Sequence, residues 1–239
     1  MFLKVIRLLA HLLLPLIAKI EINNLDRLPK QGSYVMVANH LGRLDAILAV
    51  LLANRSDVVV IIADKYRRYL LWRWLVYMVD GIWINRETTD FRALRQVQKR
   101  LEAGHPLGIA PEGTRSPTET LQHGKPGAAF IASRAGAPIV PISMIGTEDS
   151  MVRQRLRRGK RLHIKIQVGQ PFMLPPMPRH SKGEYLEAQT AEIMCQIAAL
   201  LPPSYRGVYA DHPRVRELLH QQNYQFPPQP PTDTLQTAS

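Results

Sequence analysis

Short apolar runs alternate with longer amphipathic stretches along the chain, from about residue 34 to residue 200. The short runs, such as VVVII and PIVPI, are apolar at nearly every position, which is typical of strands buried on both faces of a parallel sheet. Six strands are predicted, at residues 34–38, 58–62, 81–84, 107–110, 139–143 and 162–168. Helical spacing predicts helices between them, at residues 46–53, 66–79, 90–103, 125–135 and 184–200. This alternation predicts a single α/β domain with a mostly parallel central sheet flanked by helices.

The first 20 residues combine a long apolar run with regularly spaced polar positions. In a helix these positions would share one stripe, since they recur every three or four residues: Lys4, Arg7, His11, Pro15 and Lys19. A spanning helix needs about 20 consecutive apolar residues, and a secretory signal needs a small-residue cleavage site; neither is found here. We therefore expect residues 1–24 to form an amphipathic helix that docks in a membrane interface. The alternatives are a core helix with a narrow polar face and a short tilted insertion.

The rest of the chain forms one unit, because no internal repeat divides it. We assign residues 25–203 to this domain and residues 204–239 to a C-terminal extension. From about residue 225 the extension is rich in proline and has no periodicity, so it is expected to be disordered.

The charge of the chain indicates its class of partner. There are 31 Lys and Arg against 19 Asp and Glu, a formal net charge of +12 over 239 residues. This excess favours a polyanionic partner, either nucleic acid or an anionic membrane surface. The single cysteine, Cys195, excludes a disulfide scaffold and a cysteine-based zinc site. The eight histidines show no metal-ligand spacing, so no metal is expected.

Two segments concentrate the cations. Residues 66–77 (YRRYLLWRWLVY) interleave arginines with aromatic residues, which is typical both of nucleic-acid binders and of membrane interfaces. As a helix, this segment would also have an apolar face suited to partial burial in the core, formed by Leu70, Leu71, Trp74, Leu75 and Met78. Residues 153–161 contain six cations. These either form a solvated surface or, beside a membrane, add about 1 kcal/mol of attraction each to anionic lipid.

A histidine and an aspartate follow the first predicted strand of the domain. Asn39 and His40 come directly after the strand, and Asp45 follows five residues after the histidine. Open α/β sheets place their sites at the carboxyl ends of strands, and the turn into a helix lets the two side chains approach each other. The carboxylate would then fix the imidazole tautomer and leave the other ring nitrogen free as a base. Since the chain has no G-x-S-x-G motif, such a pair would activate a hydroxyl or water brought by the substrate.

A second motif, PEGTRS, follows the strand predicted at residues 107–110 and lies on the same expected edge of the sheet. Gly113 permits close approach of the backbone, and Arg115 offers a planar fork suited to phosphate oxygens, with hydroxyls from Thr114 and Ser116 beside it. Two further candidate cations are Arg86, directly after the strand predicted at residues 81–84, and Lys125 in the sequence HGKPG. Cations after successive parallel strands make a convergent anion site.

These motifs resemble those of the glycerolipid acyltransferases. The resemblance rests on four blocks in order, over residues 25 to 200: Asn39-His40-x4-Asp45, Gly81-x4-Arg86, Glu112-Gly113-Thr114-Arg115-Ser116 and Val140-Pro141-Ile142. It implies transfer of a fatty acyl group from a thioester of coenzyme A or acyl carrier protein to a lysophospholipid hydroxyl. The expected acceptor is 1-acyl-sn-glycerol 3-phosphate, which would give phosphatidic acid. No cofactor beyond the acyl donor is implied.

The resemblance also implies roles for particular residues. His40 would be the base and Asp45 its orienting partner, while Arg86 and Arg115 would bind phosphate with help from Glu112 and Gly113; Thr114 and Lys125 complete the expected substrate site. We expect the oxyanion donors to be backbone amides near Gly42 or Gly113. Two positions depart from the family pattern, since Gly42 replaces a serine and Ala110 a phenylalanine.

Three readings of the sequence therefore remain. The first is an acyltransferase associated with the cytoplasmic face of an anionic membrane, peripherally or monotopically, with no nucleic-acid partner; its acceptor could also be another lysolipid or glycerol 3-phosphate. The second is a lipid or thioester hydrolase that uses the same dyad to activate water. The third is a basic binding module without catalysis, which would leave the His40–Asp45 pair and the PEGTRS turn without a role.

Overall fold

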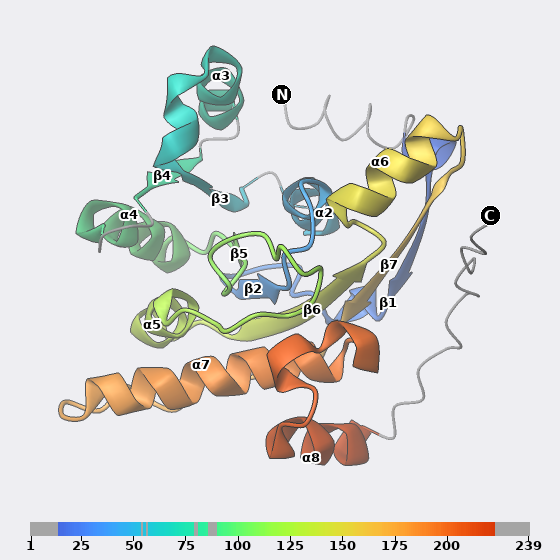
Figure 1. The fold of residues 1–239 in the computed structure, drawn as a ribbon. Helices are drawn as coiled ribbons and strands as arrows, with labels where there is room; N and C mark the ends of the chain where they lie inside the picture. Colours follow the sequence, from blue (N-terminus) through green and yellow to red (C-terminus); the bar gives the residue numbers. More distant parts are fainter. Residues whose placement is uncertain (1–13, 54, 56, 79–80, 86–89, 223–239) are drawn as a thin grey trace.

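Seven strands form one sheet in the order β1-β7-β6-β2-β5-β3-β4 (Figure 1). The computed structural model describes residues 14–222 apart from 54, 56, 79–80 and 86–89. The strands are β1 Ala18–Asn23, β2 Val35–Ala38, β3 Val59–Ala63, β4 Ile82–Ile84, β5 Leu107–Ile109, β6 Ile139–Ile145 and β7 Leu162–Val168. Neighbouring strands are parallel except for β6 and β7, which are antiparallel. The predicted α/β fold with a mostly parallel sheet is confirmed.

Helices cover both faces of this sheet (Figure 1). The α-helices are α2 Leu44–Leu52, α3 Leu70–Met78, α4 Phe91–Glu102, α5 Gly127–Ala135, α6 Asp149–Arg157, α7 Lys182–Ala199 and α8 Pro213–Gln222. Short 3-10 helices lie at η1 Leu25–Arg27, η2 Asp64–Arg68, η3 Pro203–Tyr205 and η4 Gly207–Tyr209. Helices α5 and α7 lie on one side of the sheet, and α2, α3 and α6 lie on the other.

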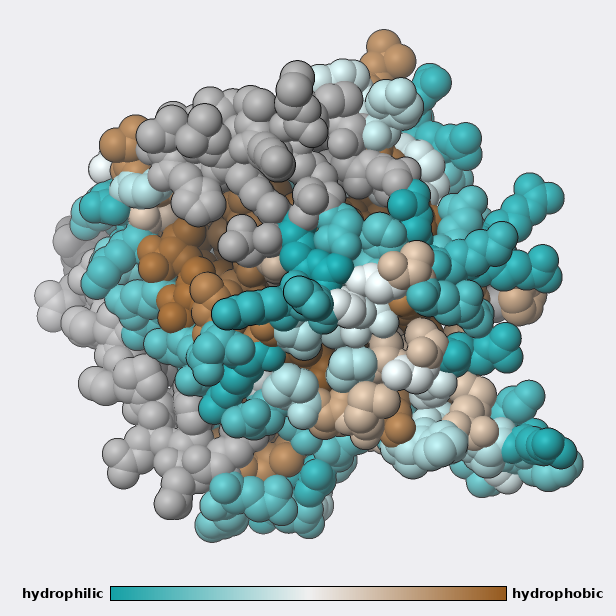
Figure 2. Space-filling model, turned by 180° about the vertical axis from the view of Figure 1, so that it is seen from behind, coloured by the Kyte–Doolittle hydropathy of each residue, from teal (hydrophilic) through white to brown (hydrophobic). Residues whose placement is uncertain are grey.

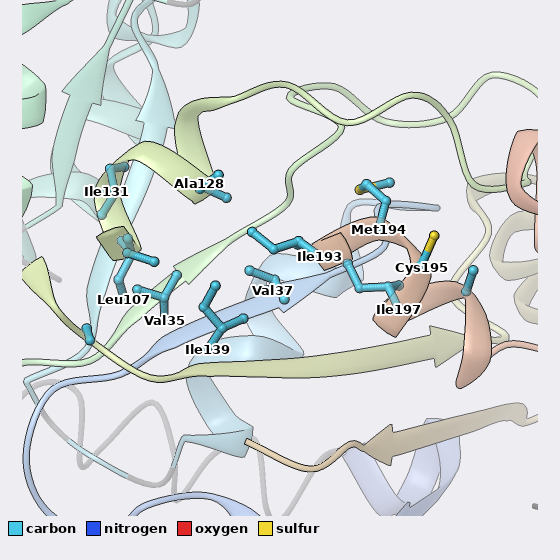
Figure 3. Packing of buried hydrophobic residues seen from close by; sticks show 14 of the residues in the cluster. Val35, Val37, Leu107, Ala128, Ile131, Ile139, Ile193, Met194, Cys195 and Ile197 are labelled. Atoms are coloured by element: carbon cyan, nitrogen blue, oxygen red, sulfur yellow. The ribbon is translucent and has the colours of Figure 1, made fainter. Parts of the chain in front are cut away.

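The central strand β2 explains the two-layered core. Its side chains alternate between the faces of the sheet, so Val35 and Val37 pack with α5 and α7 (Figure 3), while Met36 and Ala38 pack with α2. Because both faces are covered, every residue of β2 is buried and its sequence is continuously apolar. Seen from behind, the surface is mostly hydrophilic, with hydrophobic residues gathered in a few patches (Figure 2).

The N-terminal prediction is wrong over part of its length. Residues 1–13 lie outside the described residues, but Ala18–Asn23 form strand β1, which pairs in parallel with β7 along the edge of the sheet. Within the expected helix of residues 1–24, the sequence AKIEIN alternates apolar and polar residues with period two, which is the signature of a strand exposed on one face. The helix was predicted from the longer apolar run before these six residues, and their short alternating pattern was included in it.

Two helices were not predicted. The basic run after residue 150 belongs to α6 and the turn that leads into β7. Helix α8 lies in the segment assigned to a C-terminal extension, yet Tyr209, Val215 and Leu218 are buried in the same cluster as α7. Residues 204–222 therefore continue the domain, and residues 223–239, with the predicted disorder, lie outside the described residues.

Candidate active site

The loops that follow β2, β5 and β6 meet at one edge of the sheet, because these three strands are parallel and adjacent. His40 lies two residues after β2, and Asp45 is in the first turn of α2. Nδ1 of His40 is 2.9 Å from Oδ2 of Asp45. The prediction that these two side chains approach each other is therefore confirmed.

Asp45 is held by the loop that it closes. Its Oδ2 also accepts hydrogen bonds from the backbone amides of Leu41 and Gly42, at 2.7 and 2.8 Å. Three donors on one oxygen fix the carboxylate and, through it, the plane of the His40 ring. Since Nδ1 faces Asp45, Nε2 is the imidazole nitrogen that can meet a substrate.

Glu112 of the PEGTRS turn lies behind His40 rather than beside it. Its Oε1 accepts a hydrogen bond from the backbone amide of His40 at 2.7 Å, and its Oε2 accepts one from the amide of Gln122 at 3.0 Å. Burial raises the pKa of this carboxyl to about 7, although both amide donors lower it. In return, the carbonyl of His40 accepts a hydrogen bond from the amide of Ser116 at 2.8 Å. Glu112 thus fixes the histidine backbone to the second motif.

Sequence reasoning assigned no role to Asn39 or Thr147. The buried side chain of Asn39 exchanges two hydrogen bonds with the backbone of Met144 in β6, at 2.7 and 2.8 Å. Thr147, in the loop after β6, explains Gly42: a Cβ at position 42 would lie 1.8 Å from the carbonyl oxygen of Thr147. The position of Asn39, between a buried strand and a candidate base, could have indicated its role from the sequence. The role of Thr147 is visible only in the fold.

A cavity of about 630 Å³ opens beside the dyad. His40, Asp45, Gly113 and Lys125 lie at its polar part, and the aliphatic stem of Lys125 packs against Gly113, where a Cβ would lie 2.9 Å from Cδ of the lysine. Most of the remaining wall is apolar and comes from β3, α2, α4 and α5, including Ile61, Ala49, Leu94 and Phe130. The cavity can hold an aliphatic chain with a polar end at the imidazole.

Arg115 is ion-paired. Its guanidinium is 2.5 Å from Oδ2 of Asp149 at the start of α6. The guanidinium of Arg43 approaches the same oxygen at 3.3 Å, and the amide of Arg43 donates to Oδ1 at 3.0 Å. Two cations therefore converge on one carboxylate beside the His40 loop. Both guanidinium groups therefore share this carboxylate.

The other expected binding residues differ in their placement. Thr114 is exposed, and Arg86 lies in a segment outside the described residues. The amides of Gly42 and Gly113 themselves donate to Asp45 and to the carbonyl of Ala110; the oxyanion donors expected near these glycines stay a prediction. Within the described ranges, no group of three or more His, Cys, Asp and Glu side chains is arranged to hold a metal ion. No helix in this part of the chain is long and apolar enough to cross a bilayer.

Comparison with known proteins identifies the family. A family model described as Acyltransferase matches residues 19–145, just over half of the chain. A probable 1-acyl-sn-glycerol-3-phosphate acyltransferase of Mycoplasma pneumoniae is 30% identical over 165 residues, covering 66% of this chain and 62% of that protein. The human 1-acyl-sn-glycerol-3-phosphate acyltransferase alpha is 30% identical over 168 residues, covering 67% and 55%. The chain thus spans less than two thirds of the length of these relatives.

A solved structure gives the same fold. The crystal structure of the 1-acyl-sn-glycerophosphate (LPA) acyltransferase PlsC from Thermotoga maritima superposes with a TM-score of 0.60 at 23% identity, covering 80% of this chain and 76% of that one. The matched family model includes the His40–Asp45 loop and the PEGTRS turn. The chain belongs to the Acyltransferase family.

Proposed function

We propose that the protein transfers a fatty acyl group from an acyl thioester to the free hydroxyl of a lysophospholipid. The proposed acceptor is 1-acyl-sn-glycerol 3-phosphate, the product is phosphatidic acid, and the donor is acyl-CoA or acyl carrier protein. The observation that carries the proposal is the position of the His40–Asp45 pair at the polar part of a largely apolar cavity. The names of the relatives support the same acceptor.

In the proposed mechanism His40 acts as a general base. Nε2 takes the proton of the acceptor hydroxyl as its oxygen attacks the thioester carbonyl, and Asp45 stabilises the resulting imidazolium. When the tetrahedral intermediate collapses, the C–S bond breaks and the imidazolium returns the proton to the thiolate. Each substrate supplies one reacting group, so no acyl-enzyme is formed.

The phosphate of the acceptor is proposed to lie beside Arg115. Arg43 and Arg115 carry two charges against the single charge of Asp149, and a phosphate monoester can share both guanidinium groups. Lys125 lies in the cavity beside Gly113, where its ammonium can meet the polar end of a substrate. Arg86 keeps its expected role in phosphate binding on the strength of its sequence motif.

The protein is proposed to work at the cytoplasmic face of a membrane, where an acceptor whose acyl chain partitions into lipid can meet a water-soluble acyl donor. Its net charge of +12 favours an anionic surface.

Transfer from acyl-CoA to an acceptor panel, read by product mass, tests this function. The panel contains lysophosphatidic acid, its dephosphorylated monoacylglycerol and glycerol 3-phosphate. Arg115→Ala should lower kcat/KM for lysophosphatidic acid by roughly 10–150-fold, mainly through KM, since a charge-assisted contact contributes about 1.5–3 kcal/mol. Arg134→Ala, which removes an exposed arginine of α5, is the matched control and should have no effect.

The panel also separates the alternatives. Equal losses on the phosphorylated and dephosphorylated acceptors would remove Arg115 from the phosphate site. Thioester or ester cleavage without any acceptor would identify a hydrolase instead.

A further inference from the structure

Helix α3 exposes a row of large apolar side chains. Leu70, Trp74 and Tyr77 are 77%, 51% and 82% exposed. They are spaced by four and three residues, so they lie on one face of the helix. Val76, on a different face, is 3% exposed and attaches the helix to the rest of the protein. Leu70 and Trp74 therefore do not form the buried face that the sequence allowed.

Four cations lie close to this face along the chain. Lys65, Arg67 and Arg68 precede the helix in η2, Arg73 lies within it, and all four are exposed. Arg68 stacks on the exposed ring of Tyr69, 4.8 Å from its centroid. Exposed apolar side chains and exposed cations are thus neighbours in this segment, where Arg67 also lies 3.8 Å from Asp64.

Charge is distributed unevenly around the molecule. Helix α6, on the same side of the sheet as α3 (Figure 1), is also basic, with Arg153, Arg155 and Arg157. Helices α7 and α8 differ, because Glu184, Glu187, Glu192 and Glu217 outnumber Lys182, Arg214 and Arg216. The side that carries the exposed aromatic residues is therefore the side that attracts anions.

We infer that α3 is a membrane-docking surface, which inserts Leu70, Trp74 and Tyr77 among the headgroups of an anionic bilayer while the arginines contact lipid phosphates. Trp and Tyr favour this depth, because their rings are apolar and their polar edges remain hydrated. Leu70 favours lipid over nucleic acid, since an aliphatic side chain neither stacks on a base nor contacts a phosphate.

The surface is coupled to the cavity by the chain itself. Helix α3 connects β3 to β4, and Val59, Val60 and Ile61 of β3 and Ile84 of β4 line the cavity. A docked α3 therefore holds this wall of the cavity next to lipid. The inference deepens the proposed function, on which it rests, by naming where the protein meets the membrane that contains its substrates.

Tryptophan fluorescence tests the docking directly. Trp83 is the single tryptophan outside α3, so Trp83→Phe leaves Trp72 and Trp74 as the only emitters. Adding vesicles of phosphatidylcholine and phosphatidylglycerol in equal parts should move their emission to shorter wavelength, with a smaller effect for pure phosphatidylcholine. Because both emitters belong to α3, this signal is independent of any other lipid contact of the chain.

Matched variants separate the apolar and the charged contributions. Leu70→Ser, Trp74→Ser and Tyr77→Ser together should weaken vesicle binding at least 10-fold. Met173→Ser with Val208→Ser, which changes two apolar residues elsewhere that are 57% and 55% exposed, should not. Replacing Arg67, Arg68 and Arg73 by Gln should weaken binding to anionic vesicles by roughly 100-fold, at about fivefold per cation. The same replacement of Arg92, Arg95 and Lys99 on α4 should have a much smaller effect.

Two acceptors distinguish docking from catalysis. The Leu70, Trp74 and Tyr77 triple variant should lose transfer to lysophosphatidic acid in vesicles but keep transfer to a short-chain, monomeric lysophosphatidic acid. The docking inference would be overturned if vesicles left the emission of the Trp83→Phe protein unshifted and the triple variant bound vesicles as well as the wild type. This holds even if transfer to the soluble acceptor is intact. Tighter binding of the same surface to a single-stranded oligonucleotide than to vesicles would also overturn it. A shift in emission without transfer to either acceptor would uphold the docking surface and contradict the proposed function.

Discussion

The loop after β2 and the segment after β3 are built in opposite ways, although both follow parallel strands of the same sheet. In the first, the amides of residues 40–42 are bonded to the carboxylates of Glu112 and Asp45. In the second, Leu70, Trp74 and Tyr77 project from α3 into solvent. Proton transfer needs atoms fixed to within a fraction of an ångström, whereas insertion into lipid needs side chains that are free to leave water. The same substitution should therefore have different consequences in the two regions.

Removing the base should have the largest effect. We expect His40→Ala to lower kcat by about 10²–10⁴, the usual contribution of a general base, while thermal unfolding stays unchanged. Asp45→Asn should also be severe, because it removes the charge that stabilises the imidazolium. Steady-state transfer assays with melting curves check both. Retention of more than about a tenth of wild-type turnover by His40→Ala would refute its role as the base.

Glu112 should make stability depend on pH. Its pKa is about 7 in the folded protein against an ordinary 4.5, so between these values the unfolded chain loses a proton that the folded chain keeps. The free energy of unfolding should therefore fall as pH rises from 4.5 to 7, by at most about 3 kcal/mol, and level off above 7. Glu112→Gln should lack this decline, as urea denaturation across the pH range would show.

The exposed Glu184 provides the matched control. Glu184→Gln keeps Glu112, so its free energy of unfolding should still fall as pH rises from 4.5 to 7. At neutral pH, Glu112→Gln should also turn an amide group toward a backbone N–H and cost about 1–3 kcal/mol through an unsatisfied buried donor. An identical pH profile for Glu112→Gln and the wild type would contradict this account of Glu112.

Gly42 should tolerate no side chain. Gly42→Ala would place Cβ against the carbonyl oxygen of Thr147, so we expect a loss of about 1–3 kcal/mol in the free energy of unfolding. Turnover should also fall, because the Gly42 amide holds Asp45. Gly183→Ala, on α7 with open space at its Cβ, is the control and should be neutral or stabilising. Equal melting temperatures for the two variants would show that the loop after β6 can move to accommodate the added methyl group at little cost.

The smallest effect on stability should come from α3. Leu70→Ser and Tyr77→Ser should each change the free energy of unfolding by no more than about 0.5 kcal/mol, because these side chains are 77% and 82% exposed. Val76→Ala, on another face of the same helix, should cost more than about 1 kcal/mol. Chemical denaturation measures both, and a large loss from the exposed positions would mean that α3 packs against protein rather than lipid.

Local patterns determined most of the fold and the dyad. Strands such as β2 and β6 were predictable because burial on both faces requires continuous apolar sequence. His40 and Asp45 were predictable because five residues across a strand-to-helix turn bring them together without help from the rest of the chain. Strand β1 was not predicted, because its alternation of apolar and polar residues is short and follows directly after a longer apolar run; it lies at an edge of the sheet.

Tertiary structure decided what these residues meet. Asn39 bonds to Met144, Glu112 to His40 and Arg115 to Asp149, and nothing in the local sequence specifies partners that lie 34 to 105 residues apart. The apolar positions of α3 likewise fit burial or exposure equally well, because periodicity describes the helix alone. Whether an apolar face meets the core or the solvent depends on what the fold places opposite it. For Leu70, which is 77% exposed, the fold places solvent there.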